Sequence, residues 1–152
     1  MKISLIAVGR LRKGPERTLV DDYLTRFDRT GRGLGLPSVT VQEVEAKGQM
    51  SEAEAINRAL PPGAALVLLD ERGRLLSSPD LAKHLEAWRD DARDIAFVIG
   101  GADGLDQDLR VRADLAISFG PMVWPHMLAR VMLAEQLYRA ASILSGAPYH
   151  RA

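Results

Sequence analysis

The sequence contains no cysteine and no metal-binding spacing of histidines, and these absences exclude two kinds of protein. Without cysteine, the 152-residue chain forms no disulfide framework and has no thiolate for catalysis or for binding zinc. The three histidines, His84, His126 and His150, are far apart, and none has a partner at the spacing of metal ligands. We therefore expect no protein-bound metal.

Long apolar runs and targeting segments are also missing. The apolar stretch at residues 1–8 is too short for the hydrophobic region of a signal peptide, and no other segment reaches the length of a membrane span. We expect this stretch to be a buried strand. The protein is then expected in the cytoplasm, without a membrane partner.

An excess of charge of one sign is absent as well, because 20 Lys and Arg residues balance 20 Asp and Glu residues. This balance argues against binding of nucleic acid by bulk charge alone. The distribution is uneven: residues 1–32 carry eight basic and four acidic side chains, a local net charge of +4. A solvated surface of mixed sign is the plainer explanation of that excess.

Strand and helix patterns alternate along the whole chain, without an internal repeat, a low-complexity tract or a linker. We expect strands at residues 2–8, 39–44, 64–69, 95–99 and 115–119. We expect helices at residues 15–29, 51–60, 78–88, 106–112 and 126–145, and a turn at residues 72–74. The alternation predicts one α/β domain over residues 1–152, with a mostly parallel sheet flanked by helices.

The last expected helix has two apolar sides instead of one. Leu128, Val131, Met132 and Ile143 cluster on one side, and Leu133, Leu137 and Leu144 lie nearly opposite. A surface helix of a monomer needs only one apolar stripe. A second subunit covering the other side explains the pattern, and so does a central helix enclosed within one small domain.

Three segments leave the carboxyl ends of expected central strands, where parallel sheets bind ligands: residues 69–71, 100–104 and 120–125. The glycine segment allows close approach of backbone N–H groups to a ligand, although a tight turn explains it equally well. The segment Met122-Val123-Trp124 is apolar, lies between two prolines and is expected to be buried. The segment suits the binding of an adenine ring. The alternative is that its side chains only fill the hydrophobic core.

The C-terminal sequence Pro148-Tyr149-His150-Arg151 has chemistry that a frayed polar tail does not need. Tyr can stack on a base, His can move a proton near neutral pH, and Arg can hold a phosphate or an anionic base edge. Glu135 and Arg139 are four residues apart, a spacing that favours an ion pair on one helix.

These segments together resemble the RlmH family of SPOUT-class methyltransferases over essentially the whole chain. The resemblance is carried by the opening Val8-Gly9-Arg10, by residues 69–73, 77–78 and 99–104, and most specifically by residues 124–128, Arg130, 135–136, 138–140 and 148–151. It implies a sheet whose C-terminal part is threaded into a trefoil knot, and a homodimer that holds its cofactor at the subunit interface. Nothing but the resemblance supports the knot.

By the same resemblance, S-adenosylmethionine would be the cofactor. It would contact the following residues: Leu69, Gly100, Phe119, Gly120, Pro121, Met122, Val123 and Trp124. We add Gly101 because it adjoins Gly100. Trp124 departs from the smaller apolar residue expected in relatives, and its bulk would alter the pocket wall.

The resemblance also implies the reaction, methylation of N3 of a pseudouridine in 23S ribosomal RNA of the assembled ribosome. His150 would accept the N3 proton, Tyr149 would position the base, and Arg151 or Arg130 would stabilise the anionic imide. Two rival hypotheses are a SPOUT methyltransferase acting on tRNA and a non-catalytic ribosome-associated or nucleotide-binding module.

Overall fold

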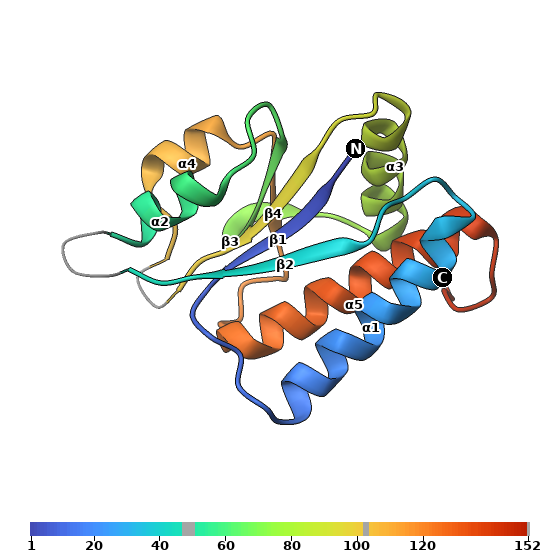
Figure 1. Ribbon diagram of the computed structural model, residues 1–152, viewed down its shortest axis with the longest axis horizontal. Coiled ribbons are helices and arrows are strands. Elements are labelled where there is room, and N and C mark those ends of the chain that lie inside the picture. The colour runs from blue at the N-terminus through green and yellow to red at the C-terminus, as the bar shows by residue number, and fades with distance from the viewer. Residues whose placement is uncertain (47–50, 102–103, 152) are drawn as a thin grey trace.

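The computed structural model describes residues 1–46, 51–101 and 104–151, and the strands in this part of the chain form one fully parallel sheet. The order across the sheet is β2-β1-β4-β3-β5 (Figure 1). The strands are β1 (Ile3–Val8), β2 (Val39–Val44), β3 (Ala65–Leu75), β4 (Ile95–Ile99) and β5 (Leu115–Ser118). The expected mostly parallel α/β architecture is therefore confirmed.

Helices cover both faces of this sheet and give three layers. On one face lie α1 (Pro15–Arg32), α3 (Ser78–Asp90) and α5 (His126–Ser145), and on the other lie α2 (Glu52–Ala59) and α4 (Gln107–Arg112). Figure 1 shows α1 and α5 side by side beneath the sheet. Because side chains alternate along a strand, Phe97 of β4 enters the first core and its neighbour Val98 enters the second.

Side-chain caps explain where three of the helices begin. The Ser51 hydroxyl accepts a hydrogen bond from the Glu54 N–H at 3.1 Å, and Ser77 Oγ accepts from the Asp80 N–H at 3.2 Å. Asp106 caps α4 in the same way. Each cap satisfies an N–H group that the helix itself leaves unpaired, and stabilises the helix by about 1 kcal/mol.

Two expected boundaries were wrong. The first helix continues past residue 29 to Arg32. The turn expected at residues 72–74 is instead part of β3, which runs on to Leu75, although its pairing with β5 shifts register between Leu69 and Arg74. A Cβ atom at Gly73 would lie only 2.6 Å from the carbonyl group of Ala116, so glycine permits the close approach of β3 to β5 here.

The parallel arrangement places the carboxyl ends of the strands along one edge of the sheet, which we call the carboxyl edge. The helix α5 begins next to this edge and runs back toward the opposite side of the molecule, where the C-terminal residues follow (Figure 1). Among the described residues, none of the helices combines the length and the apolar character that crossing a bilayer requires.

Candidate functional site

A cavity of about 380 Å³ lies beyond the carboxyl ends of β3, β4 and β5, and we call it the edge cavity. Its volume falls within the range of small-molecule sites in proteins. Most of the residues predicted to contact the cofactor line it: Leu69, Gly100, Gly101, Phe119, Gly120, Met122, Val123 and Trp124. Pro121 lies in the same loop but is not part of the lining. Sequence positions far apart thus meet at one edge, as the strand order requires.

The glycine segment is held tightly on the side that faces α2. The Gly101 N–H donates to Glu52 Oε1 at 3.1 Å. A Cβ atom at Gly101 would overlap the Glu52 carboxylate and lie 2.9 Å from Val8 Cγ1, and one at Gly100 would lie 3.0 Å from Leu105 Cδ2. Only glycine fits here without displacing these neighbours. Ala102 and Asp103, which belong to the same motif, lie outside the described residues.

An ion pair that the sequence did not reveal forms another part of the wall. Asp70, at the end of the regular part of β3, accepts from Arg110 Nε of α4 at 2.8 Å, and its side chain is only 8% exposed. Its other oxygen accepts from the Arg72 N–H at 3.0 Å. His126, at the start of α5, also lines the cavity and was not predicted there. Asp70 and Arg110 are 40 positions apart in the sequence. A pair so far apart leaves no local pattern, so it could not be predicted from the sequence.

The apolar loop after β5 was expected to be buried, and in this chain it is not. Met122 is 71% exposed and Val123 is 86% exposed. The loop is nevertheless tied down, because the Trp124 indole N–H donates to the Phe119 carbonyl at 3.3 Å and the Gly120 N–H donates to Ser118 Oγ at 3.0 Å. Its apolar side chains therefore surround the edge cavity without being covered by the rest of the chain.

The C-terminal tail folds back onto α5. The Tyr149 ring lies 4.6 Å from the Tyr138 ring, and the Arg139 guanidinium lies over it at 4.8 Å. Arg139 Nη1 contacts His150 Nδ1 at 3.2 Å. The predicted Glu135–Arg139 ion pair is confirmed, with Oε1 and Nε 2.6 Å apart. Burial, aided by the Glu135 carboxylate, raises the pKa of the Tyr149 phenol, which stays neutral at physiological pH.

Within one chain the tail and the edge cavity are separate. His150 contacts α5 at Arg139, which lies about 20 Å along the helix from His126 at the cavity. Tyr149, His150 and Arg151 are not among the residues that line the edge cavity. Their predicted catalytic roles therefore need either a movement of the tail or a tail from a second chain.

Arg130, the remaining predicted catalytic residue, does not line the edge cavity either. It is 5% exposed, and its Nη1 donates to Glu43 Oε2 at 2.6 Å while its Nη2 donates to the Gly9 carbonyl at 3.2 Å. Desolvation opposes ionisation of Glu43, but hydrogen bonds from the Leu11 N–H and from Arg130 outweigh it and lower the pKa of this carboxyl. The Glu43 carboxyl is therefore ionised at neutral pH.

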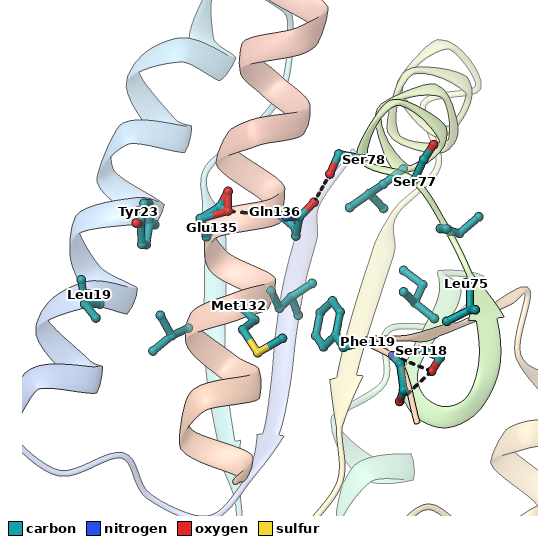
Figure 2. A pocket seen from close by; sticks show the side chains of 16 residues that line it. Leu19, Tyr23, Leu75, Ser77, Ser78, Ser118, Phe119, Met132, Glu135 and Gln136 are labelled. Atoms are coloured by element: carbon teal, nitrogen blue, oxygen red, sulfur yellow. Dashed lines mark hydrogen bonds between the residues drawn. The ribbon is translucent and has the colours of Figure 1, made fainter. Parts of the chain in front are cut away.

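A second cavity of about 540 Å³, the apolar cavity, lies between α1, α5 and the segment that follows β3. Figure 2 shows Phe119 and Met132 facing it, with Leu19 and Tyr23 on α1. Gln136 accepts from the Ser78 hydroxyl at 2.6 Å at its upper end. Ile117, Phe119 and Gly120 line both this cavity and the edge cavity, so one short segment forms a wall between the two.

Side chains able to hold a metal do not gather at these cavities. Over residues 1–46, 51–101 and 104–151, no group of three or more His, Asp or Glu side chains is placed to bind a metal ion. The polar groups of the edge cavity are main-chain groups of the glycine segment, the Asp70–Arg110 pair, Glu71, Arg72 and His126, and with the apolar lining they suit an organic ligand.

Comparison with known proteins shows the family of the chain. A family described as "Predicted SPOUT methyltransferase" matches residues 1–150. Proteins called ribosomal RNA large subunit methyltransferase H are 68% identical in Cereibacter sphaeroides strain KD131 and 64% identical in Ruegeria pomeroyi, over 99% of each chain. A probable methylase family protein from Haemophilus influenzae has the same fold, with a TM-score of 0.53 at 13% identity, over 99% of this chain and 70% of that one. The chain therefore belongs to the SPOUT methyltransferase family and, within it, to the ribosomal RNA large subunit methyltransferase H group.

Proposed function

We propose that this protein transfers a methyl group from S-adenosylmethionine to N3 of a pseudouridine in 23S ribosomal RNA. The observation that carries the proposal is the edge cavity, which gathers the predicted cofactor residues from three separate segments at the carboxyl edge of a parallel sheet. Full-length identity of 68% to a protein called ribosomal RNA large subunit methyltransferase H supports the RNA substrate.

The edge cavity fits an adenosyl group in chemistry as well as in size. The side chains of Leu69, Phe119 and Val123 provide apolar surface for a planar ring. Gly100 and Gly101 place main chain at the cavity wall, and the hydrogen bond from the Gly101 N–H to Glu52 fixes that wall in position. The cofactor would be held by these residues, with the Asp70–Arg110 pair fixing the loop below it.

S-adenosylmethionine supplies an electrophilic methyl group on its sulfonium. What remains for the protein is to align the acceptor nitrogen with that methyl group, to hold the base out of its stack and to remove the N3 proton. N3 of an imide has no free lone pair until the proton is lost. His150 accepts this proton, directly or through water, and Tyr149 positions the base.

Arg151 is a better candidate than Arg130 for stabilising the anionic imide. Arg130 already holds Glu43 and the Gly9 carbonyl in a buried position outside the edge cavity. Arg151 is exposed and belongs to the same tail as His150. Its guanidinium can approach an oxygen of the base together with the other two tail residues.

The active form is a homodimer in which the tail of one chain completes the edge cavity of the other. Three observations support this. The loop at residues 122–124 is apolar and exposed, Leu75 beside the apolar cavity is 76% exposed, and Met127 and Leu128 of α5 are 49% and 41% exposed. Exposed large apolar side chains in such number are typical of an interface. The tail and the edge cavity, separate within one chain, would meet across it.

The trefoil knot implied by the family belongs to the same proposal. The resemblance to the family is what supports it. The assembled large subunit is the expected substrate, because 152 residues with no net charge offer little surface for selecting naked RNA. The protein would then act in the cytoplasm, where ribosomes are.

Mass spectrometry of ribosomal RNA nucleosides tests the proposal directly. Large subunits from cells that lack the protein are incubated with S-adenosylmethionine, with and without the purified protein, and 3-methylpseudouridine is quantified. We expect the product only when the protein is present, and much less of it on protein-free 23S RNA. Methylation of purified tRNA instead would favour a tRNA enzyme. Absence of cofactor binding in calorimetry would favour a non-catalytic module.

A further inference from the structure

The loop between β1 and α1 is fixed by a network that begins on α5. Glu43 Oε2, at the end of β2, accepts from the Leu11 N–H at 2.6 Å and from Arg130 Nη1 at 2.6 Å. The Gly9 N–H donates to the Val44 carbonyl at 2.9 Å, and the Gly9 carbonyl accepts from Arg130 Nη2. Residues 9–11 are therefore bound on both sides, so the arginines next to them project from a rigid base.

These arginines surround a cavity of about 460 Å³ that the proposed methyl-transfer site does not include. We call it the arginine cavity, and its charged lining consists of Arg10, Arg12, Arg17, Arg130, Asp21 and Glu43. The four arginines exceed the two carboxylates, and Glu43 is already bound by Arg130 and by a backbone N–H. Three of the eight basic side chains of residues 1–32 thus meet at one concave place, where Asp21 is the only acidic side chain from the same segment.

Arg130 gives this cavity a feature that a merely solvated basic surface lacks. Its side chain is 94% buried, and its Nε has no hydrogen-bond partner among the described residues. A buried N–H without an acceptor costs free energy unless a ligand or water supplies one. Guanidinium groups bind phosphate oxygens through two N–H groups at once, and three exposed arginines at the rim match that chemistry.

The arginine cavity also lies beside the edge cavity. Ala129 lines the edge cavity and its neighbour Arg130 lines the arginine cavity, so the first turns of α5 separate the two. Figure 1 shows the start of α5 close to the loop between β1 and α1. A strand whose base enters the edge cavity would therefore carry its neighbouring phosphates past Arg10, Arg12 and Arg17.

We propose that the arginine cavity binds phosphates of the ribosomal RNA strand that flank the methylated nucleotide. The inference rests on the proposed function for the identity of the RNA, and it deepens that function by assigning the surface that holds the backbone. Phosphate contacts position a strand without reading its sequence. The arginine cavity thus sets where the target base stands relative to the methyl donor.

The test replaces Arg10, Arg12 and Arg17 together by Gln and measures binding to large ribosomal subunits at several salt concentrations. All three side chains are exposed, so the variant keeps the fold, and a thermal melt checks this. We expect the dissociation constant to rise at least about tenfold. The slope of log K against log salt concentration should fall in magnitude by about two, because each phosphate contact to a single strand contributes about 0.7 to that slope and three contacts are lost. Cofactor binding stays unchanged.

The matched control replaces Arg29, Arg58 and Lys83 by Gln, which removes the same charge from exposed positions outside all three cavities. Equal weakening in both triple variants, or an unchanged salt slope in the first, overturns the arginine cavity as a phosphate site.

Binding and methylation are measured separately, so that failure of the inference and failure of the proposed function can be told apart. A wild-type protein that binds subunits through these arginines but forms no 3-methylpseudouridine defeats the proposed function alone, and a first variant that methylates with wild-type KM defeats the inference alone.

Discussion

Arg139 Nη1 lies 3.2 Å from His150 Nδ1, so this ring nitrogen faces a group that can only donate a hydrogen bond. While the contact is made, Nδ1 is not available to take a proton from a substrate. His150 must leave Arg139 before Nδ1 acts as a base, as it would if the tail extended into the edge cavity of a second chain.

The base role of His150 predicts how two substitutions behave. His150→Ala should lower the methylation rate about 100-fold or more, with cofactor and subunit affinity unchanged, because it removes the proton acceptor. His150→Gln should be as slow, since an amide donates a hydrogen bond but does not accept a proton at neutral pH. Single-turnover rates measure both. If His150→Gln kept the wild-type rate, His150 would be a hydrogen-bond donor to the base and not its proton acceptor.

The two tryptophans of the chain allow cofactor binding to be located by fluorescence. Trp124 lines the edge cavity and is 40% exposed, whereas Trp88 belongs to α3, faces the core and is 8% exposed. In a Trp88→Phe variant, S-adenosylmethionine should change the intensity or wavelength of the remaining emission. In a Trp124→Phe variant it should leave the emission unchanged. The opposite assignment of the signal would place the cofactor away from the edge cavity.

The close packing around Gly101 predicts a specific loss of cofactor affinity. In Gly101→Ala the new methyl group displaces the Glu52 carboxylate and presses on Val8, so the hydrogen bond that holds the glycine segment is lost. We expect cofactor affinity to fall about tenfold or more in calorimetry, while the protein remains folded. Gly33→Ala is the matched control, because the nearest atom would be 4.0 Å away, and it should bind normally. Equal binding by both variants would contradict a tight glycine wall.

Local patterns were enough to predict most of the fold. Apolar runs at residues 64–69 and 95–99 give β3 and β4, and Ser51 with Glu54 gives the start of α2. The extension of β3 through Gly73 was missed because it depends on the close approach of β5, about 40 residues away. A turn signal in the sequence says nothing about such a contact.

The candidate site was predictable where residues follow strand ends, and was not predictable where side chains contact partners far away in the sequence. Gly100 and Phe119 lie where the topology of a parallel sheet places them. Arg130 was expected beside the reacting base, but its partner Glu43 is 87 residues away, and that pair could not be found from spacing. Exposure of Met122 and Val123 was also missed, since apolar side chains alone do not tell whether a second chain covers them.

The Arg130–Glu43 pair predicts how stability depends on pH. The folded-state pKa of Glu43 lies below its ordinary value of 4.5, so its contribution is complete above that pH and is lost as the pH falls through the lowered folded value. Glu43→Gln should therefore lower the free energy of unfolding by about 1–2 kcal/mol at pH 7, a figure reduced for the partial exposure of Glu43. The difference from wild type should shrink in urea unfolding at pH 3.

The control for this prediction is Glu86→Gln, whose carboxylate is 49% exposed and lies 3.8 Å from Arg89. An exposed pair of this kind contributes less than about 0.5 kcal/mol, and its removal should change little at either pH. The same Glu43→Gln variant should also loosen residues 9–11, because the Leu11 N–H loses a charged acceptor. Faster amide hydrogen exchange at Leu11 is the expected result. A destabilisation that stayed constant from pH 7 to pH 3 would mean that the ionised carboxylate is not what holds Arg130.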